Sequence, residues 1–432
     1  MEMGRLLADF RRFARDRGIN GSCFLVGGSV RAILAGEKSP KDADIALRGN
    51  ALKAARGFAE EAGATFVLLD ERFGMARVVR GDEHLDISRF RGKGIEEDLS
   101  KRDITINAMA FPLTSRRLID PLGGARDLMR GIVRVISEDN LAQDPLRILR
   151  CYRFSAAAGF RIERNSAAAL KRLAPLLRKP APERITEEFQ KILSSQGAGR
   201  VLERMLKDGV LRVIMPGFRG ANLIALKTLR RAWARPTLLA PPGMGRKWAI
   251  KKFHYSPEAF FPIELAVLAS GTAGRAMGRF VLSKRRRQLI ERLYHLRPRL
   301  KRLCKMRRPC KSWGLQEKYA GRAAATRLLR DAGDEIYAHL LFSCAFSIAE
   351  GEEEGEGFLE FSRTLLALYI KEVRPRLAKK QISGEDLKKE FNLEPSPFFK
   401  TVLDRVQMKW LLGEVKDRQG ALLAAKKIID RA

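Results

Sequence analysis

The chain has 432 residues and is strongly basic, with 83 lysine and arginine residues against 50 aspartate and glutamate residues and a formal net charge of +33. Such an excess destabilises a compact protein unless a polyanion shares its surface, so we expect a nucleic acid as partner. No apolar run approaches the roughly 20 residues of a membrane span, and the amphipathic N-terminal segment lacks the apolar centre of a signal peptide, so we expect no membrane association.

The five cysteines are scattered without a C-x-x-C pair, and only four histidines are present. These counts favour reduced thiols in a cytoplasmic protein. They argue against a zinc site and against a histidine-based metal hydrolase. The sequence gives no indication of the oligomeric state.

The first third of the chain mixes strand and helix patterns, and the remainder is helical, so the predicted fold class is α+β. Strands are expected at 23–26, 43–47, 65–69, 76–80, 84–90 and 117–120, and helices near 4–17, 28–36 and 50–62. Helical periodicity then predominates, for example at 145–158, 165–176, 184–194 and 198–208. Together with proline-rich breaks, these patterns predict four parts, at 1–137, 138–200, 201–310 and 311–432.

A glycine turn between the first strand and the following helix is the first functional motif. Gly27 and Gly28 let the backbone come close to a ligand. The helix that opens with Ser29 and contains Arg31 presents free N–H groups at its start, where phosphate binds readily. We therefore expect a phosphate cradle here.

Two acidic residues alternate along the next strand. Asp42 and Asp44 share one face of it and can hold divalent cations, and we expect two Mg²⁺ ions. One ion would lower the pKa of an attacking 3′-hydroxyl, and the other would neutralise the departing pyrophosphate. Asp86 is the candidate third catalytic carboxylate, with an exposed strand residue as the alternative. A lone D-x-D pair is more often a solvated strand end, so this interpretation depends on the motifs downstream.

The segment 101–108 places cationic and polar groups just before an apolar strand. Arg102 suits triphosphate oxygens and Asn107 suits a sugar hydroxyl, whereas a capped helix start is the alternative. Further along, Gly123 and Gly124 form a turn where the mixed part meets the helical part. We interpret this turn as a hinge or connector.

Asp144 and Arg147 are three residues apart at the start of a helix, so both can lie on one face. A carboxylate accepts from an exocyclic amine and a guanidinium donates to ring acceptors, so this pair can select cytosine and adenine over uracil and guanine without a template. An N-capping Asp and a solvated Arg are the alternative. Arg184 and Glu188, four apart, can form an ion pair that braces a helix.

These blocks, in this order, resemble the class II tRNA nucleotidyltransferase and poly(A) polymerase family of the polymerase-β superfamily. The match runs from Phe24 to about Phe189 and includes the G-G-x-V-R, D-x-D, R-D-x-T-x-N-A, G-G-x-x-D-L, D-P-x-R-x-L-R and E-R-I-x-x-E blocks. The resemblance implies a polymerase-β-like nucleotidyltransferase head, a neck with the base-reading motif, and an RNA-binding body and tail. It implies Asp42 and Asp44 as metal ligands. The implied nucleotide-binding set comprises Gly27, Gly28, Ser29, Arg31, Arg102, Asp103, Asn107, Asp144, Arg147, Arg150 and Arg153.

One departure from the family pattern lies before the R-D block. Full CCA-adding enzymes and poly(A) polymerases carry a flexible loop there, whereas residues 91–95 alone separate Phe90 from Glu96 in this chain. In the family, loss of the loop is associated with enzymes that add CC and stop, because the loop is a lever that re-forms the pocket for adenine. A short but adequate lever at Gly92 and Gly94 is the alternative.

The predicted function is template-independent addition of CC to the tRNA 3′ end from CTP, with Mg²⁺ and release of pyrophosphate. Full CCA addition with ATP, poly(A) addition and a non-catalytic RNA-binding role are the alternatives. Basic clusters that would follow the tRNA backbone by shape lie at 246–247, 251–255, 284–287 and 297–311.

Overall fold

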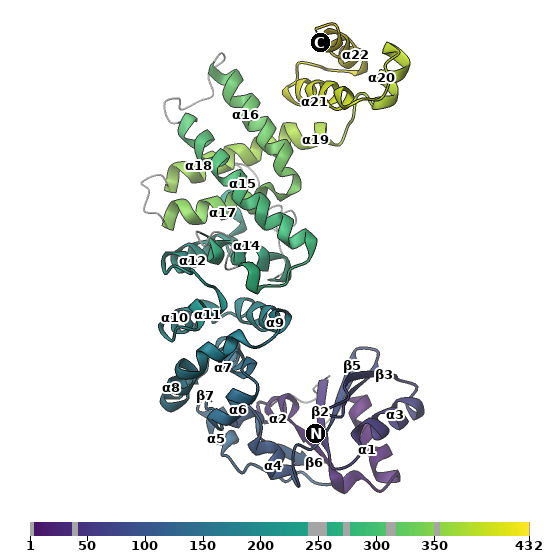
Figure 1. Cartoon of the computed structure of the whole chain (residues 1–432), viewed down its shortest axis with the longest axis vertical. Helices are drawn as coiled ribbons and strands as arrows, with labels where there is room; N and C mark the ends of the chain where they lie inside the picture. The colour runs from purple at the N-terminus through teal and green to yellow at the C-terminus, as the bar shows by residue number, and fades with distance from the viewer. Residues whose placement is uncertain are drawn as a thin grey trace. The chain divides into compact units, whose positions relative to one another are not determined.

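The computed structural model describes residues 4–36, 42–240, 257–270, 277–307, 317–349 and 355–431. The chain forms two compact units, Met1–Pro216 and Gly217–Ala432. The first unit contains a mixed sheet with helices, and the described part of the second is helical (Figure 1). The predicted α+β class is therefore confirmed, while the division into four parts stays a prediction.

A six-stranded sheet lies in the first unit, with the order β3-β4-β5-β2-β1-β6. The β2–β5 pair is parallel, and the other neighbours in this sheet pair antiparallel. The strands are β1 (Cys23–Val26), β2 (Asp42–Leu47), β3 (Thr65–Asp70), β4 (Met75–Arg80), β5 (Glu83–Arg89) and β6 (Ala110–Pro112).

One face of the sheet is covered by α1 (Arg5–Asp16) and α3 (Ala51–Glu61), which lie on the same side of it in Figure 1. Because side chains alternate along a strand, Ala43 and Ile45 of β2 enter the core under these helices. The acidic residues of β2 are consequently directed to the opposite, second face.

The second face is only partly covered. Leu99 of α4 (Ile95–Ser100) packs with Val26 and Ala46 at the β1 end of the sheet. Helix α2 (Gly28–Leu34) follows β1 directly. The part of this face formed by β4 and β5 carries charged side chains and is where the candidate site lies.

The strand predicted at 117–120 is wrong. Ile119 makes a single bridge to Ala110 at the margin of the sheet, and the sixth strand is β6, which corresponds to the apolar strand expected after residue 108. Arg116 and Arg117 before the bridge are exposed, so this segment lacks the apolar alternation that would hold a strand on the core.

The rest of the first unit is mostly helical. Its elements are α5 (Gly124–Met129), β7 (Ile132–Val133), α6 (Glu138–Gln143), α7 (Leu146–Ala158), β8 (Arg161–Ile162), α8 (Arg164–Leu173), α9 (Pro182–Leu193), α10 (Ala198–Lys207) and α11 (Val210–Ile214). Helices α7 to α10 lie within a few residues of the predicted helical ranges. The short β7–β8 pair was not predicted.

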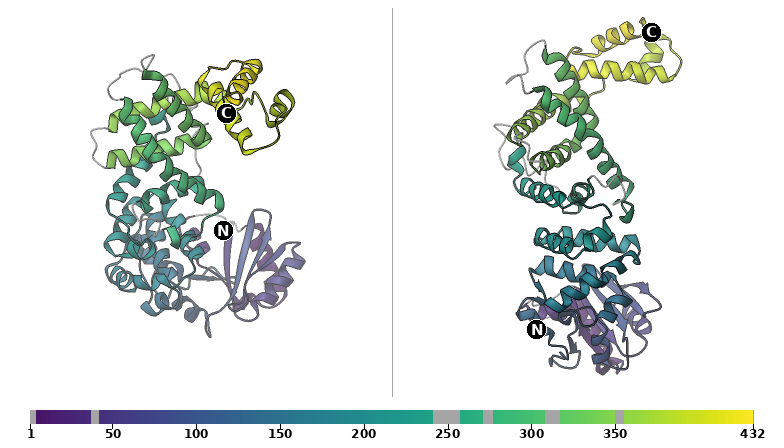
Figure 2. Two further views of the ribbon diagram at one scale, coloured as in Figure 1. Left: turned by 45° about the horizontal axis from the view of Figure 1, so that its top comes forward. Right: turned by 60° about the vertical axis from the view of Figure 1, so that its left-hand side comes forward.

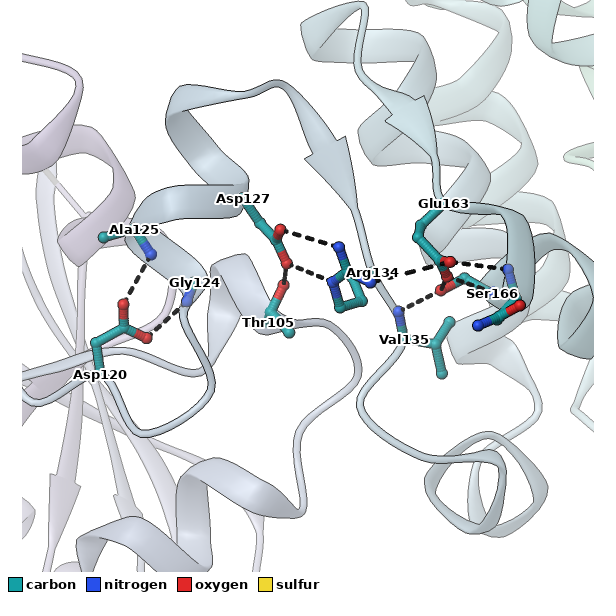
Figure 3. Close-up of polar contacts among 10 residues, drawn as sticks. Thr105, Asp120, Gly124, Ala125, Asp127, Arg134, Val135, Glu163 and Ser166 are labelled. Carbon is teal, nitrogen blue, oxygen red and sulfur yellow. Dashed lines mark hydrogen bonds and ion pairs between the residues drawn. The ribbon is translucent and has the colours of Figure 1, made fainter.

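Hydrogen bonds hold the turn at Gly123 and Gly124, so it is not a free linker (Figure 3). The Asp120 carboxylate accepts from the N–H groups of Gly124 at 2.6 Å and Ala125 at 2.9 Å. A Cβ on Gly124 would overlap the backbone carbonyl of Thr105, so glycine is needed for this close approach.

A chain of polar contacts runs from Thr105, beside this turn, toward the helical part (Figure 3). The hydroxyl of Thr105 donates to Asp127 at 2.8 Å, and Arg134 Nε donates to the same Asp127 oxygen at 2.9 Å. Arg134 also lies 3.9 Å from Glu163, which accepts from the backbone N–H of Ser166 at 2.8 Å. Asp127 is 1% exposed, so these contacts form a buried connection between the R-D-x-T-x-N block and α8.

In the second unit, α17 (Ile336–Ala349) is buried among other helices. The other α-helices described there are α12 (Ala221–Trp233), α14 (Pro257–Ala269), α15 (Lys284–Arg307), α16 (Glu317–Ala332), α18 (Gly355–Leu368), α19 (Arg374–Leu377), α20 (Gly384–Phe391), α21 (Pro397–Leu412) and α22 (Arg418–Ile429). Helices α20 to α22, yellow in Figure 2, share a small apolar core of their own.

Two of the predicted basic clusters lie on α15, at 284–287 and 297–307. The clusters at 246–247, 251–255 and 308–311 lie outside the described residues. None of the helices in the described ranges is long and apolar enough to cross a membrane.

Candidate active site

A cleft of about 610 Å³ opens over the second face of the sheet, within the first unit. Nine basic and five acidic side chains line it, so its lining carries a net positive charge. The predicted site residues in this lining are Gly27, Gly28, Arg31, Asp44, Asp86, Arg102, Asp103, Asn107, Arg147, Arg150 and Arg153. Three other predicted residues, Ser29, Asp42 and Asp144, are not part of the lining.

Three charged residues form a row across the second face of the sheet. The strand register places Asp44 of β2 beside Asp86 of β5, and Asp86 beside Arg77 of β4. Arg77 donates to both Asp86 oxygens, from Nε at 2.7 Å and from Nη2 at 2.8 Å, which raises the pKa of the guanidinium. Because Arg77 engages both oxygens, a role for Asp86 as a third metal ligand would require this pair to open.

Asp44 lies against the glycine turn. The Gly28 N–H donates to Asp44 Oδ2 at 3.2 Å. A Cβ on Gly27 would lie 2.9 Å from the same oxygen, and the φ of Gly27 is +66°, so both space and backbone require glycine. Burial raises the pKa of the Asp44 carboxyl, and the positive charge of Arg102 opposes this rise. Asp44 thus lies in surroundings where a cation would favour its ionised form.

Asp42 shares the second face with Asp44 but is more exposed, with 66% of its side chain accessible. Its Oδ1 lies 2.9 Å from His84 Nδ1. Ser29 lies behind the two carboxylates, where its hydroxyl donates to the Asp42 carbonyl at 3.2 Å and accepts from the Asp44 N–H at 3.1 Å. Ser29 therefore ties α2 to β2 through the backbone.

The donor set suits magnesium better than zinc. Asp42 and Asp44 offer carboxylate oxygens, and Mg²⁺ commonly binds one or two protein carboxylates and keeps several waters. In the described ranges, no group of three or more His, Cys, Asp or Glu side chains is arranged to hold a metal. The two aspartates therefore fit the Mg²⁺ ions expected from the sequence.

Arg102 is anchored by Asp98 of α4. Its Nη2 donates to Asp98 Oδ2 at 2.9 Å, and its Nη1 lies 3.5 Å from the Asn107 carbonyl. The other oxygen of Asp98 accepts from the Arg91 N–H at 3.0 Å. Asp98 is 3% exposed, so water screens this ion pair little. One buried carboxylate thus positions Arg102 and the start of the 91–95 connection.

Asn107 joins α2 to the R-D-x-T-x-N block. Its Nδ2 donates to Asp103 Oδ1 at 2.7 Å, and its Oδ1 accepts from Arg31. Burial lowers the pKa of the Arg31 guanidinium, and the charge of Asp103 opposes this. The guanidinium also lies over the Phe154 ring of α7, 4.8 Å from its centroid.

The two residues of the predicted base-reading pair, Asp144 and Arg147, lie in different surroundings. Arg147 is buried, which lowers the pKa of its guanidinium, and its Nη1 donates to the Asn140 carbonyl at 3.0 Å. Asp144, just before α7, pairs with Arg184 Nη2 at 3.2 Å. Arg147 thus lines the cleft, whereas Asp144 is not part of its lining and pairs with Arg184.

The predicted ion pair between Arg184 and Glu188 is wrong. Glu188 is 5% exposed and accepts from Arg153 Nε at 2.8 Å, with Arg150 Nε at 3.9 Å. The reason is that α9 packs on α7, so the buried side of α9 carries Glu188 toward the arginines of α7. Arg184 lies on a more exposed side and pairs with Asp144 instead.

The connection at 91–95 is a closed turn that lies against α4. The Lys93 N–H donates to Glu97 Oε2 at 2.8 Å, and the Lys101 ammonium contacts both Glu97 and the Arg91 carbonyl. With the bond from the Arg91 N–H to Asp98, the turn is held at several points.

The chain matches two known families. Residues 23–134 match the "Poly A polymerase head domain", and residues 159–221 match the "Probable RNA and SrmB-binding site of polymerase A". A CC-adding tRNA nucleotidyltransferase of Synechocystis sp. is 36% identical over 206 residues, 48% of this chain and 49% of that protein. An A-adding tRNA nucleotidyltransferase of Deinococcus radiodurans is 38% identical over 200 residues, 45% of each. These matches agree with the resemblance of the motif order to the class II tRNA nucleotidyltransferase and poly(A) polymerase family.

The matched part of the chain spans about half the length of the two curated relatives. Similarity over nearly the whole chain comes from solved structures. The Thermotoga maritima CCA-adding enzyme complexed with tRNA has a TM-score of 0.68 at 24% identity, covering 98% of this chain and 96% of that one. A CCA-adding enzyme complexed with CTP has a TM-score of 0.72 at 24% identity, covering 99% and 95%. These likenesses show a common fold.

Several residues line the cleft although the sequence motifs did not single them out. Alternation on β4 could have placed Arg77 opposite the buried residues of that strand. Phe154 is seven residues after Arg147, or two helical turns, and so shares its side of α7. Phe73 and Lys191 lie outside the motif blocks, and their place in the cleft depends on tertiary structure.

Proposed function

We propose that the chain is a template-independent tRNA nucleotidyltransferase that adds CC to the tRNA 3′ end from CTP and releases pyrophosphate. The observation that carries the proposal is the cleft itself. One wall supplies Asp44, the glycine turn, Arg102 and Asn107, and the other supplies the arginines of α7. A carboxylate site beside a cationic, amide-rich surface is suited to nucleotidyl transfer from a triphosphate.

The residues of the cleft have distinct roles in this proposal. The N–H groups at the start of α2, with Arg31 and Arg102, bind the triphosphate, and Asn107 binds the sugar. Asp42 and Asp44 would hold two Mg²⁺ ions. When bound, these ions activate the 3′-hydroxyl and stabilise the departing pyrophosphate.

The nucleobase is selected at the start of α7. Ionised Asp144 only accepts hydrogen bonds, so it suits the N4 amine of cytosine, while Arg147 suits the ring acceptors. A uracil carbonyl would face the carboxylate without a hydrogen bond between them, and a buried polar group without its partner is strongly disfavoured. The ion pair with Arg184 holds Asp144 in place between α6 and α9.

Addition of CC alone is favoured by the closed turn at 91–95. Its backbone is hydrogen-bonded to Glu97 and Asp98. It therefore lacks the long flexible loop whose movement would reshape the pocket for adenine. The similar proteins include both a CC-adding and an A-adding enzyme, so the choice depends on this turn. The basic surface of the chain supports an RNA acceptor.

Product length tests the proposal. The protein is incubated with Mg²⁺ and tRNA lacking its CCA end, with CTP, with ATP, or with both. Two added cytidines in every reaction that contains CTP are expected. Efficient addition of A after CC would assign full CCA addition, and long A tracts would assign poly(A) addition. Tight tRNA binding without incorporation would assign a non-catalytic RNA-binding role.

A further inference from the structure

An exposed phenylalanine marks the turn between β3 and β4. Phe73 is 47% exposed, yet it lines the cleft that holds Asp44. Its N–H donates to Asp70 Oδ1 at 3.0 Å, and Gly74, with φ +59°, reverses the chain after it. The backbone therefore holds the aromatic ring in an accessible position where it adds little to the core.

The ring is surrounded by cationic groups. The guanidinium carbons of Arg72 and Arg91 lie 5.5 Å and 5.7 Å from its centroid. Arg89 lines the same cleft and packs against Gly74, where a Cβ would lie 3.3 Å from Arg89 Cβ. An accessible aromatic ring among arginines is the usual platform for a single-stranded base and its phosphates.

The position of Phe73 relative to the carboxylates suggests which strand would use this platform. The groups suited to the triphosphate, at the glycine turn and Arg102, lie on the β1 side of Asp44. On the other side of Asp44 come β5 and β4, and Phe73 follows at the turn that precedes Met75 of β4. In an in-line displacement the attacking oxygen and the leaving pyrophosphate lie on opposite sides of the phosphorus. The attacking hydroxyl therefore approaches from the side of β5 and β4.

We propose that Phe73, flanked by Arg72 and Arg91, stacks on the 3′-terminal base of the RNA acceptor and so positions its hydroxyl at Asp44. This rests on the proposed function and names the acceptor subsite of the same cleft. Stacking is tolerant of base identity because every base has a π-face. That tolerance suits an enzyme that must accept first the tRNA end and then the same end extended by one cytidine.

The experiment compares Phe73→Ala, Phe73→Trp and Leu68→Ala in the full chain. Leu68 is the control because it is a 50% exposed apolar residue of β3 that lies outside the cleft lining. Loss of one stacked base costs about 1–3 kcal/mol, so Phe73→Ala should raise KM for the RNA by roughly 5- to 150-fold. KM for CTP should stay within about twofold, and Phe73→Trp and Leu68→Ala should resemble the wild type.

A second readout reports stacking directly. RNA carrying 2-aminopurine as its 3′-terminal base should lose fluorescence on binding to the wild type, Phe73→Trp and Leu68→Ala, but not on binding to Phe73→Ala. An active wild type with unchanged RNA KM and unchanged quenching in Phe73→Ala would overturn the acceptor subsite and leave the proposed function intact. A wild type that transfers no nucleotide would overturn both.

Discussion

Arg77 donates two hydrogen bonds to Asp86, at 2.7 and 2.8 Å, directly beside Asp44 in the strand register. The Arg77 guanidinium thereby neutralises Asp86, which would otherwise add negative charge next to the buried carboxylate of Asp44. Asp86 already contributes to the raised pKa of Asp44, although burial is the larger cause.

Replacing Arg77 by Met should therefore raise the pKa of Asp44 further, because Asp86 loses its counter-charge. Asp44 must be ionised to bind a cation, so activity is lost as pH falls through its pKa. We expect the acidic limb of the pH–rate profile to move to higher pH. In the double variant Arg77→Met with Asp86→Asn the limb should return toward the wild-type position, and a limb that stays displaced there would contradict this explanation.

Asp42→Ala and Asp44→Ala should each reduce CTP incorporation at least about a thousandfold, since metal-assisted stabilisation of the transition state supplies several kcal/mol. RNA binding, measured by fluorescence anisotropy, should persist because the basic surface is unchanged. Ser29→Ala is a useful comparison, because Ser29 touches only the backbone of these residues. An unchanged incorporation rate in both Asp variants would refute the two-carboxylate mechanism.

Asp144→Ala should relax discrimination against UTP, with the ratio of kcat/KM for CTP to that for UTP falling roughly tenfold or more. The dependence of the rate on Mg²⁺ concentration should stay close to that of the wild type, since Asp144 is not part of the cleft lining with Asp44. Arg184→Gln should have a smaller effect in the same direction, because it loosens the Asp144 carboxylate without removing it. Unchanged nucleotide preference in Asp144→Ala would count against the base-reading role.

Gly27→Ala and Gly28→Ala form a matched pair. At Gly27 the added Cβ would lie 2.9 Å from Asp44 Oδ2 on a backbone with φ +66°, whereas at Gly28 the nearest atoms lie at 3.6 Å. We expect Gly27→Ala to lose about 1–3 kcal/mol of stability and most of its activity, while Gly28→Ala keeps wild-type stability. Thermal unfolding and CTP incorporation measure both effects. Equal behaviour of the two variants would contradict the close-approach argument.

His339 of α17 predicts a pH-dependent stability of the second unit. It is 0% exposed, neither ring nitrogen has a hydrogen-bond partner within the described ranges, and burial lowers its pKa from 6.5 to about 4. The unfolded chain therefore binds the proton first as pH falls below about 6.5. The contribution of His339 to stability should be constant above that pH and lower by about 2 kcal/mol at pH 5.

Hydrogen exchange of the α17 amides in increasing urea measures the stability of the second unit at each pH. The difference in stability between the wild type and His339→Leu should therefore change by about 2 kcal/mol between pH 7 and pH 5. His295→Leu on α15 is the control, because His295 is exposed and should leave the dependence as in the wild type. A difference between the wild type and His339→Leu that is the same at pH 7 and pH 5 would refute the assignment.

Local patterns of the sequence predicted much of the site, and long-range contacts account for the rest. Strand alternation was enough to place Asp42 and Asp44 on one face, and the motif order brought Gly27, Arg102 and Arg147 into one cleft. The partner of Glu188 was predicted incorrectly because helical spacing identifies neighbours on α9 but not the helix packed against it.

The Arg77–Asp86 pair was not predicted for a related reason. The two residues face each other through the register of β4 and β5, and that register depends on the turn between the strands as well as on their composition. The strand predicted at 117–120 was wrong because its two apolar residues follow exposed arginines and lack the alternation that would hold a strand on the core. The correct edge strand is three residues long, too short for a periodic pattern.

The chain of contacts from Thr105 through Asp127 and Arg134 to Glu163 has a thermodynamic consequence. It is formed within one unit and centred on a buried carboxylate, so folding itself connects the R-D-x-T-x-N block to the residue that precedes α8. The loss of conformational entropy then falls on folding rather than on each binding event. For the proposed nucleotidyltransferase, this connection would need no reordering in each catalytic cycle.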